Sequence, residues 1–145
     1  MKYSLEIEID KPLSEVAELF GDVNNLAYWQ PGFLGAEEKD GNTILTYQHG
    51  KREMEMVEAV GVDDLPREYT STFKVSGMVM KVQNLFEEAG EGRTKWTSNN
   101  DCKASGMMRV MMWVMPGCAK KQSYAYMENF KAFAEEGKDV REEQK

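Results

Sequence analysis

Six closely spaced runs of alternating residues between positions 33 and 102 constrain this chain more than any other feature of its sequence. Apolar and polar side chains alternate along most of each run, which is typical of a half-buried β-strand. Short turns such as Asp40-Gly41 separate the runs, and short turns join antiparallel neighbours. We therefore expect a meandering antiparallel sheet with strands at 33–39, 43–49, 53–62, 67–76, 78–88 and 93–102.

One strand and two short helices are predicted ahead of this series. Residues 3–9 alternate in the same way and predict a further strand. Asp10 lies where a helix-capping side chain is expected, so we predict a helix over 13–20 that Asp10 caps. A second short helix carries Trp29 and stops before Gly32.

A long helical stretch from Ser105 to Phe133 follows the strands. Pro116-Gly117 interrupts it and predicts a kink or a break. An unbroken helix of this length would measure about 43 Å, so one end would have to bend or extend past a small sheet. The charged residues after Glu136 indicate a single domain over 1–136 and a flexible tail over 137–145.

Charge and cysteine content argue against several classes of protein. The net charge of −7 does not suit a general nucleic-acid binder, which needs a basic face. The longest apolar run falls far short of the roughly 20 residues of a spanning helix, and the acidic start is not a signal peptide. We expect a cytoplasmic protein with Cys102 and Cys118 reduced, without metal or other cofactor, and a homodimer is compatible with the sequence.

The predicted order of elements requires the last helix to cover the sheet, because no other element is long and apolar enough. The fold class is therefore α+β, with a curved antiparallel sheet of about seven strands wrapped around a long C-terminal helix. In this order and in its terminal segments the chain resembles the START-like (SRPBCC, Bet v 1-like helix-grip) superfamily, and most of all its polyketide cyclase/dehydrase and lipid-transport-like branch. The segments that carry the resemblance are 3–9, 10–20, 22–29 and 127–135. The resemblance implies a fold whose members bind lipids, sterols, polyketides or hormones, catalyse cyclisations or serve as chaperone partners, without a shared catalytic residue set.

A methionine stripe over 107–115 in the helical stretch is the strongest indication of a site. Thioethers are deformable, so these side chains either fill the core, line a cavity or form an exposed patch that docks a membrane or another protein. We predict that the cavity between sheet and helix is lined by residues from both. The predicted ligand-binding residues are Trp29, Met56, Tyr69, Ser71, Phe73, Met80, Asn84, Trp96, Asn100, Met108, Met111, Met112 and Met115.

Several of these residues are polar although their strand positions predict that they face inward. Asn84, Asn100 and Ser71 lie among apolar neighbours of the same face. Either bulges turn them to solvent, or they orient the polar end of an otherwise apolar ligand. Trp29 is either a core anchor or part of the mouth of the pocket.

Three residues are candidates for acid–base chemistry. His49 is the single histidine, and it lies at a predicted strand end beside Gly50, where exposure is expected. Tyr47, two residues earlier, lies on the same face of the predicted strand as His49. Glu58 interrupts an apolar face of the strand over 53–62, and it is a rim carboxylate, the product of a bulge or a buried acid with a raised pKa. The alternation fails around 57–59, so the sequence leaves the register of this strand open.

These observations favour a protein that binds or carries a small hydrophobic or amphipathic ligand, such as a lipid, isoprenoid or polyketide-like molecule. A metal-independent cyclase or dehydratase acting on such a ligand is the first alternative, with His49, Tyr47 and Glu58 as its candidate groups. A protein-interaction module with a filled core is the second.

Overall fold

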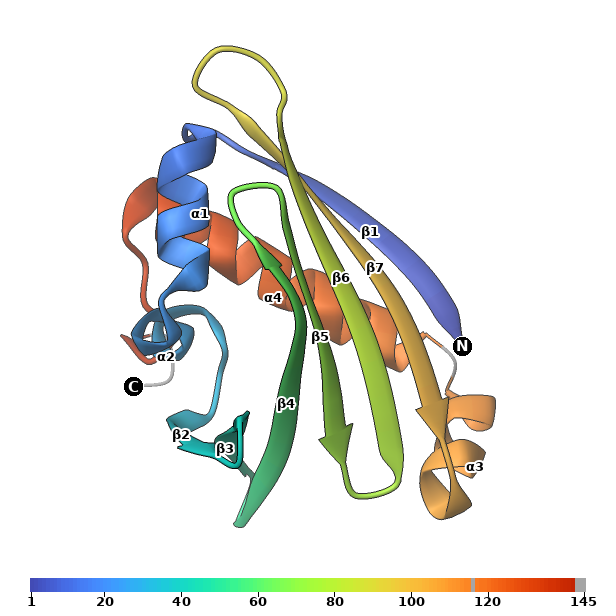
Figure 1. The fold of residues 1–145 in the computed structure, drawn as a ribbon. Helices are drawn as coiled ribbons and strands as arrows, with labels where there is room; N and C mark the ends of the chain where they lie inside the picture. Colours follow the sequence, from blue (N-terminus) through green and yellow to red (C-terminus); the bar gives the residue numbers. More distant parts are fainter. Residues whose placement is uncertain (116, 143–145) are drawn as a thin grey trace.

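The computed structural model describes residues 1–115 and 117–142, and in them seven antiparallel strands form one sheet in the order β1-β7-β6-β5-β4-β3-β2 (Figure 1). The strands are β1 (Lys2–Ile9), β2 (Phe33–Lys39), β3 (Asn42–His49), β4 (Arg52–Asp64), β5 (Glu68–Val75), β6 (Met78–Glu88) and β7 (Thr94–Ala104). The helices are α1 (Leu13–Gly21), the 3-10 turn η1 (Val23–Asn25), α2 (Leu26–Trp29), α3 (Gly106–Val114) and α4 (Cys118–Glu136). The predicted α+β class and the predicted strands are confirmed.

The strands from β2 to β7 pair in sequence order, and β1 completes the sheet beside β7. Asp40 and Gly41, at φ 53° and 82°, form the tight turn that joins β2 to β3, as the sequence predicts. The register of β4 shifts between Val60 and Val62, so a bulge lies beyond Glu58 rather than at it. Glu58 therefore lies on the same face of β4 as Met54 and Met56, as the alternation along the strand predicts.

Helix α4 crosses one face of the sheet and packs along β1 and α2 (Figure 1). The core lies where α1, α2 and the C-terminal half of α4 meet the sheet near the β6–β7 hairpin. Its buried members are Leu5, Ile9, Val16, Trp29, Phe86, Trp96, Met127, Phe130 and Ala134. Phe130 is fully buried and lies edge-on to Phe20, Trp29 and Trp96. The tight core is therefore built mostly from aromatic rings at one end of the molecule.

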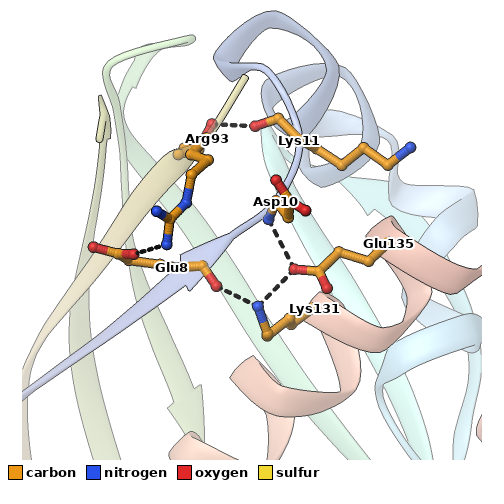
Figure 2. A network of polar contacts seen from close by, with 7 residues as sticks. Glu8, Asp10, Lys11, Arg93, Lys131 and Glu135 are labelled. Atoms are coloured by element: carbon orange, nitrogen blue, oxygen red, sulfur yellow. Dashed lines mark hydrogen bonds and ion pairs between the residues drawn. The ribbon is translucent and has the colours of Figure 1, made fainter. Parts of the chain in front are cut away.

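A polar network fastens α4 to the end of β1 (Figure 2). The Lys131 Nζ donates to the Glu8 carbonyl oxygen and to Glu135 Oε2, both at 2.6 Å. Glu135 Oε2 also accepts the backbone N–H of Asp10 at 2.8 Å. The prediction that Asp10 caps the first helix is wrong: Pro12 occupies the cap position without a side-chain hydrogen bond.

Helices α3 and α4 are separate, so the predicted interruption is a break (Figure 1). Pro116, which prompted that prediction, lies outside the described residues. Helix α3 stays beside the end of β7, and α4 starts again at Cys118 and crosses the sheet. No helix within the described ranges combines the length and apolar character needed to cross a membrane.

The part of the predicted flexible tail that the structure describes is packed against α2. Gly137 ends α4 in a left-handed conformation. Val140 is buried, its backbone N–H donates to the Tyr28 carbonyl oxygen at 2.9 Å, and the Arg141 guanidinium lies over the Tyr28 ring. Residues 137–142 of the predicted tail therefore contact α2, and Val140 supplies the apolar anchor.

Candidate functional site

The candidate site is the part of the inner sheet face that lies beyond the core. The inner face is the one that carries Phe86 and Trp96, and the strand registers place the other inward positions. Those positions include Tyr47, Met56, Glu58, Tyr69, Ser71, Phe73, Met80, Asn84, Ser98 and Asn100. Met56, Phe73 and Met80 are half-buried, so this part of the inner face is less tightly covered than the core.

Glu58 on β4 is a partly buried carboxyl group of this face. Ser71 on β5 donates its hydroxyl to Glu58 Oε2 at 2.7 Å. Burial raises the pKa of the Glu58 carboxyl, and the Ser71 hydrogen bond offsets part of that rise. Of the three interpretations that the sequence permits for Glu58, the structure supports a partly buried acid with a raised pKa.

Two tyrosines face the same carboxyl. Tyr47 on β3 is buried and donates its hydroxyl to Gln30 Oε1. Burial raises the Tyr47 pKa, and Tyr126 of α4 and Glu58 raise it further. Burial, Glu58 and Asp63 together raise the pKa of Tyr69 to about 12. Both phenols therefore keep their protons, and the single hydroxyl proton of Tyr47 is donated to Gln30.

We call Tyr47, Glu58, Tyr69 and Ser71 the carboxyl cluster. The Ser71 hydroxyl contacts the Glu58 carboxyl, and Tyr47 and Tyr69 lie within electrostatic range of it, on a face that also carries Met56, Phe73 and Met80. Such a group of side chains can hold a carbonyl or hydroxyl oxygen of a ligand. It also supplies a carboxyl group suited to proton transfer closer to neutral pH than an exposed glutamate.

The inward asparagines are buried, as one of the two sequence interpretations requires, and both have partners in the protein. Asn84 Oδ1 accepts the Trp96 indole N–H at 3.0 Å. Asn100 Nδ2 donates to the backbone oxygen and to the hydroxyl of Ser98, at 3.1 and 3.0 Å. These bonds account for part of their hydrogen-bonding capacity, so a structural role for both amides is established by the geometry.

Trp29 is a core residue, 5% exposed, between Trp96 and Phe130. Within the described chain, its indole nitrogen is the buried side-chain polar atom without a hydrogen-bond partner. The ring planes of Trp96 and Phe130 stand nearly perpendicular to that of Trp29, at 90° and 80°. Trp29 is therefore a core anchor, one of the two interpretations that the sequence leaves open.

The structure does not bring His49 to the carboxyl cluster. His49 is exposed at the end of β3, where it pairs with Arg52 across the hairpin. The proposed acid–base trio is therefore reduced to Tyr47 and Glu58.

The prediction that the methionines of 107–115 lie between sheet and helix is also wrong in its placement. Met111 and Met115 are 53% and 54% exposed, Met108 packs against the β5–β6 turn, and Met112 lies beside Met1. The physical reason is the break before α4, which leaves α3 at the end of the sheet. Apolar periodicity gives the face of a helix but does not give the surface that it contacts.

Three members of the site escaped the sequence analysis. Tyr126 of α4 has the spacing of a core residue, and Ser98 lies among small polar residues of β7. Gln30 follows α2 in a segment without periodicity. Of the three, only Ser98 could have been predicted from the sequence, because alternation places it on the same strand face as Trp96 and Asn100.

Two surface hollows, of about 420 and 410 Å³, lie away from the carboxyl cluster. The first is lined by Met1, Arg109, Val110, Met112 and Trp113. The second lies at the β5–β6 turn and is lined by Lys74, Val75, Gly77, Met78, Val79, Lys103, Ala104 and Ser105. Neither is bounded by a residue of the carboxyl cluster.

No family model and no curated protein matches the sequence. Solved structures do match the fold over almost the whole chain. A conserved protein from Geobacillus kaustophilus superposes with a TM-score of 0.81 at 14% identity, covering 92% of this chain and 95% of the other. The ZhuI aromatase/cyclase from Streptomyces sp. R1128 gives 0.71 at 15%, covering 92% and 93%.

A third similar structure is DynU16, described as a putative protein in the dynemicin biosynthetic locus. Its TM-score is 0.69 at 14% identity, and the match covers 95% of this chain but 48% of that longer one. At these identities the likeness shows the fold alone. It confirms the predicted helix-grip-like arrangement, an antiparallel sheet with the C-terminal helix packed against it.

Proposed function

We propose that this protein belongs to the START-like superfamily and binds a small amphipathic molecule between the inner sheet face and α4. The observation that carries the proposal is the carboxyl cluster on a half-buried apolar face. Removing a carboxylate from water costs free energy unless hydrogen bonds replace the water. Within the described residues, the Ser71 hydroxyl donates a hydrogen bond to Glu58. A ligand hydroxyl or carbonyl beside Glu58 would supply further hydrogen bonds.

The apolar part of the ligand would contact Met56, Phe73 and Met80, with Trp29 and Trp96 at the core side. Burial of apolar surface provides about 25 cal/mol per Å², and the cluster would fix the orientation. Asn84 and Asn100 lie at the edge of this region, and their free lone pairs and protons are available to a ligand in addition to their internal bonds. We propose these residues, together with Tyr69 and Ser71, as the ligand contacts.

The solved structures support the class of ligand without identifying it. One of them is an aromatase/cyclase, and another is described as a putative protein in the dynemicin biosynthetic locus. Polyketide-like molecules combine flat apolar rings with carbonyl and hydroxyl oxygens. Such a molecule would match a surface on which hydroxyl donors and one carboxyl interrupt methionine and aromatic side chains.

Native mass spectrometry of freshly purified protein, followed by titration with Nile red, tests binding. Met80→Lys places a charge on the inner face, and Val79→Lys places the same charge on the opposite face of the same strand. We expect Met80→Lys to weaken dye binding at least about tenfold and Val79→Lys to leave it unchanged. A mass without bound ligand together with no dye uptake would contradict the proposal and favour an interaction module.

The role of the cluster is tested with a matched pair of probes, 2-naphthol and naphthalene. Glu58→Gln and Tyr47→Phe should weaken 2-naphthol binding by about fivefold to tenfold, the range of a hydrogen bond, and leave naphthalene binding nearly unchanged. Equal effects on both probes would mean that the cluster only supports the fold.

An enzyme of the cyclase or dehydratase type is a second candidate, and the neighbouring Glu58 and Tyr47 favour it. A carboxyl with a raised pKa can exchange a proton with a ligand carbon or oxygen, and the Tyr47 hydroxyl would turn from Gln30 to donate a hydrogen bond to a developing oxyanion. Turnover of poly-β-keto thioesters by the protein, lost in Glu58→Gln while Nile red binding persists, would establish it. Binding without turnover would establish the carrier.

A further inference from the structure

Helix α3 exposes more apolar surface than any comparable element of the described chain. Its length is nine residues, and Arg109 is its single charge. Trp113 is 85% exposed and Met107 78%, and the exposed set also includes Val110, Met111, Val114 and the adjoining Met115, all above half. An apolar patch of this kind on a protein surface marks a site of interaction.

One edge of α3 holds it to the sheet. The Ser105 N–H donates to the Gly77 carbonyl oxygen at 2.9 Å, just before the helix starts. Met108 lies so close to Gly77 that a Cβ there would approach its Cγ to 3.0 Å. Met112 is half-buried beside Met1. The helix is therefore anchored at Met108 and Met112, and Trp113, Val114 and Met107 point away from the body of the protein.

The charge around α3 is opposite in sign to that of the whole protein. The sequence from Cys102 to Met127 contains Lys103, Arg109, Lys120 and Lys121 and no acidic residue, in a chain with net charge −7. Within the described residues, none of Arg109, Lys120 and Lys121 forms an ion pair. Lys120 and Lys121 lie in the first turns of α4, where cations are unfavourable beside the helix dipole. Their placement thus does not stabilise the helix that carries them.

We propose that α3 and the start of α4 dock the protein on an anionic phospholipid surface. Trp113 and the neighbouring methionines and valines would enter the interface between headgroups and acyl chains, where tryptophan is favoured. Arg109, Lys120 and Lys121 would contact the lipid phosphates. The acidic remainder of the protein would be repelled by the same surface, so the charge distribution fixes which end approaches it.

Charge favours a lipid surface over a second copy of this chain. A two-fold contact through α3 would bring the same patch of each copy together. It would place the two sets of unpaired cations against each other, between two molecules that each carry a net charge of −7. A lipid headgroup layer instead offers negative charge to the cations and apolar depth to Trp113. This proposal does not depend on a ligand in the interior.

Tryptophan fluorescence tests the proposal, because Trp29 and Trp96 are buried and Trp113 is the exposed member of the three. Mixed phosphatidylglycerol–phosphatidylcholine vesicles should shift the emission to shorter wavelength and sediment the protein. Pure phosphatidylcholine vesicles should do so much less, and salt should reverse the effect. Trp113→Phe should abolish the shift while leaving sedimentation with anionic vesicles measurable. A shift that persists in Trp113→Phe would overturn the assignment to α3.

Matched variants separate docking from general surface effects. Val110→Glu and the double change Lys120→Glu, Lys121→Glu should each weaken sedimentation with anionic vesicles at least about tenfold. Leu34→Glu is the control, because Leu34 on β2 is 54% exposed and Val110 is 55% exposed. Equal loss in the control, no sedimentation of the wild type, or a dimer in light scattering that Val110→Glu dissociates would each overturn the proposal.

Discussion

At the scale of single residues, the fold disfavours ionisation of the Glu58 carboxyl. Burial raises its pKa above the ordinary value of 4.5. The folded protein therefore holds a proton that the unfolded chain releases, and the stability linked to it is fully present below pH 4.5. That stability is lost as the pH rises through the folded-state pKa.

Glu58→Gln removes this dependence, so the variant should gain stability relative to the wild type as the pH rises from 4 to 8. A gain on the order of 1 kcal/mol at pH 8 is expected, because a partly desolvated charge is removed while the Ser71 hydroxyl keeps an acceptor. Urea unfolding at pH 4, 6 and 8 measures it. The control is Glu55→Gln, an exposed residue of the same strand. A pH-independent difference between Glu58→Gln and the wild type would contradict the assignment.

Gly32 is a second position where one residue controls the local structure. Its φ is +83°, and a Cβ there would lie 2.4 Å from the Gln48 carbonyl oxygen. Gly32→Ala should destabilise the protein by more than about 2 kcal/mol, because backbone atoms cannot give way as a side chain can. Gly41 has φ +82° and open space around its Cβ position. Gly41→Ala should therefore cost only the strain of the left-handed conformation, about 1–2 kcal/mol. Urea unfolding measures both variants, and equal losses of stability in Gly32→Ala and Gly41→Ala would show that the contact with Gln48 is unimportant.

The candidate site was predictable from the sequence where side-chain alternation holds. Alternation favoured an inward position for Ser71, Asn84 and Asn100 and left exposure through a bulge as the alternative; the three are buried, because β5, β6 and β7 keep an unbroken register. It left Glu58 open, because the bulge after Val60 follows from backbone geometry that a single sequence does not encode clearly. Tyr126 and Gln30 join the cluster only through the path of α4 and of the loop after α2, which is a tertiary property.

At the scale of elements, the strands were predictable and the relation of the two last helices was not. Each strand carries its own alternation and turn signal, so its bounds follow from local sequence. Helices α3 and α4 share an apolar pattern, but the direction that each takes depends on the connection between them. The contact between the tail and α2 was not predictable for a similar reason, because it depends on one buried valine, Val140, in a segment that is otherwise mostly charged.

The network between α4 and β1 gives a prediction at this scale. Lys131 bridges the Glu8 carbonyl oxygen and Glu135, and its side chain is 39% exposed (Figure 2). Because a partly exposed ion pair contributes little to stability, Lys131→Met should lower the free energy of unfolding in urea by about 1 kcal/mol. Lys138 pairs with Glu136 without joining two elements, and Lys138→Met should cost less than about 0.5 kcal/mol. A larger loss for Lys138→Met would show that the ion pairs do not hold α4 to the sheet.

At the scale of the whole molecule, the charges and the packing are both distributed unevenly. The aromatic core fills the end near α1, and α3 with the start of α4 carries Arg109, Lys120 and Lys121 without an acidic residue between them. Between them lies the half-buried inner face with the carboxyl cluster. A protein that both docks on a lipid surface and binds an amphipathic molecule would need these three regions, with the stable core remote from the parts that contact other molecules.

This division predicts that stability and binding respond to different residues. Phe130 is fully buried among Phe20, Trp29 and Trp96, so Phe130→Ala should cost about 3–5 kcal/mol. Phe73 is half-buried, so Phe73→Ala should lower the free energy of unfolding by less than about half of the loss in Phe130→Ala. Phe73→Ala should nevertheless weaken Nile red binding severalfold, because the lost ring is a proposed wall of the binding region. Urea unfolding and dye titration of the two variants test this, and a Phe73→Ala variant as unstable as Phe130→Ala would mean that the inner face is packed as core throughout.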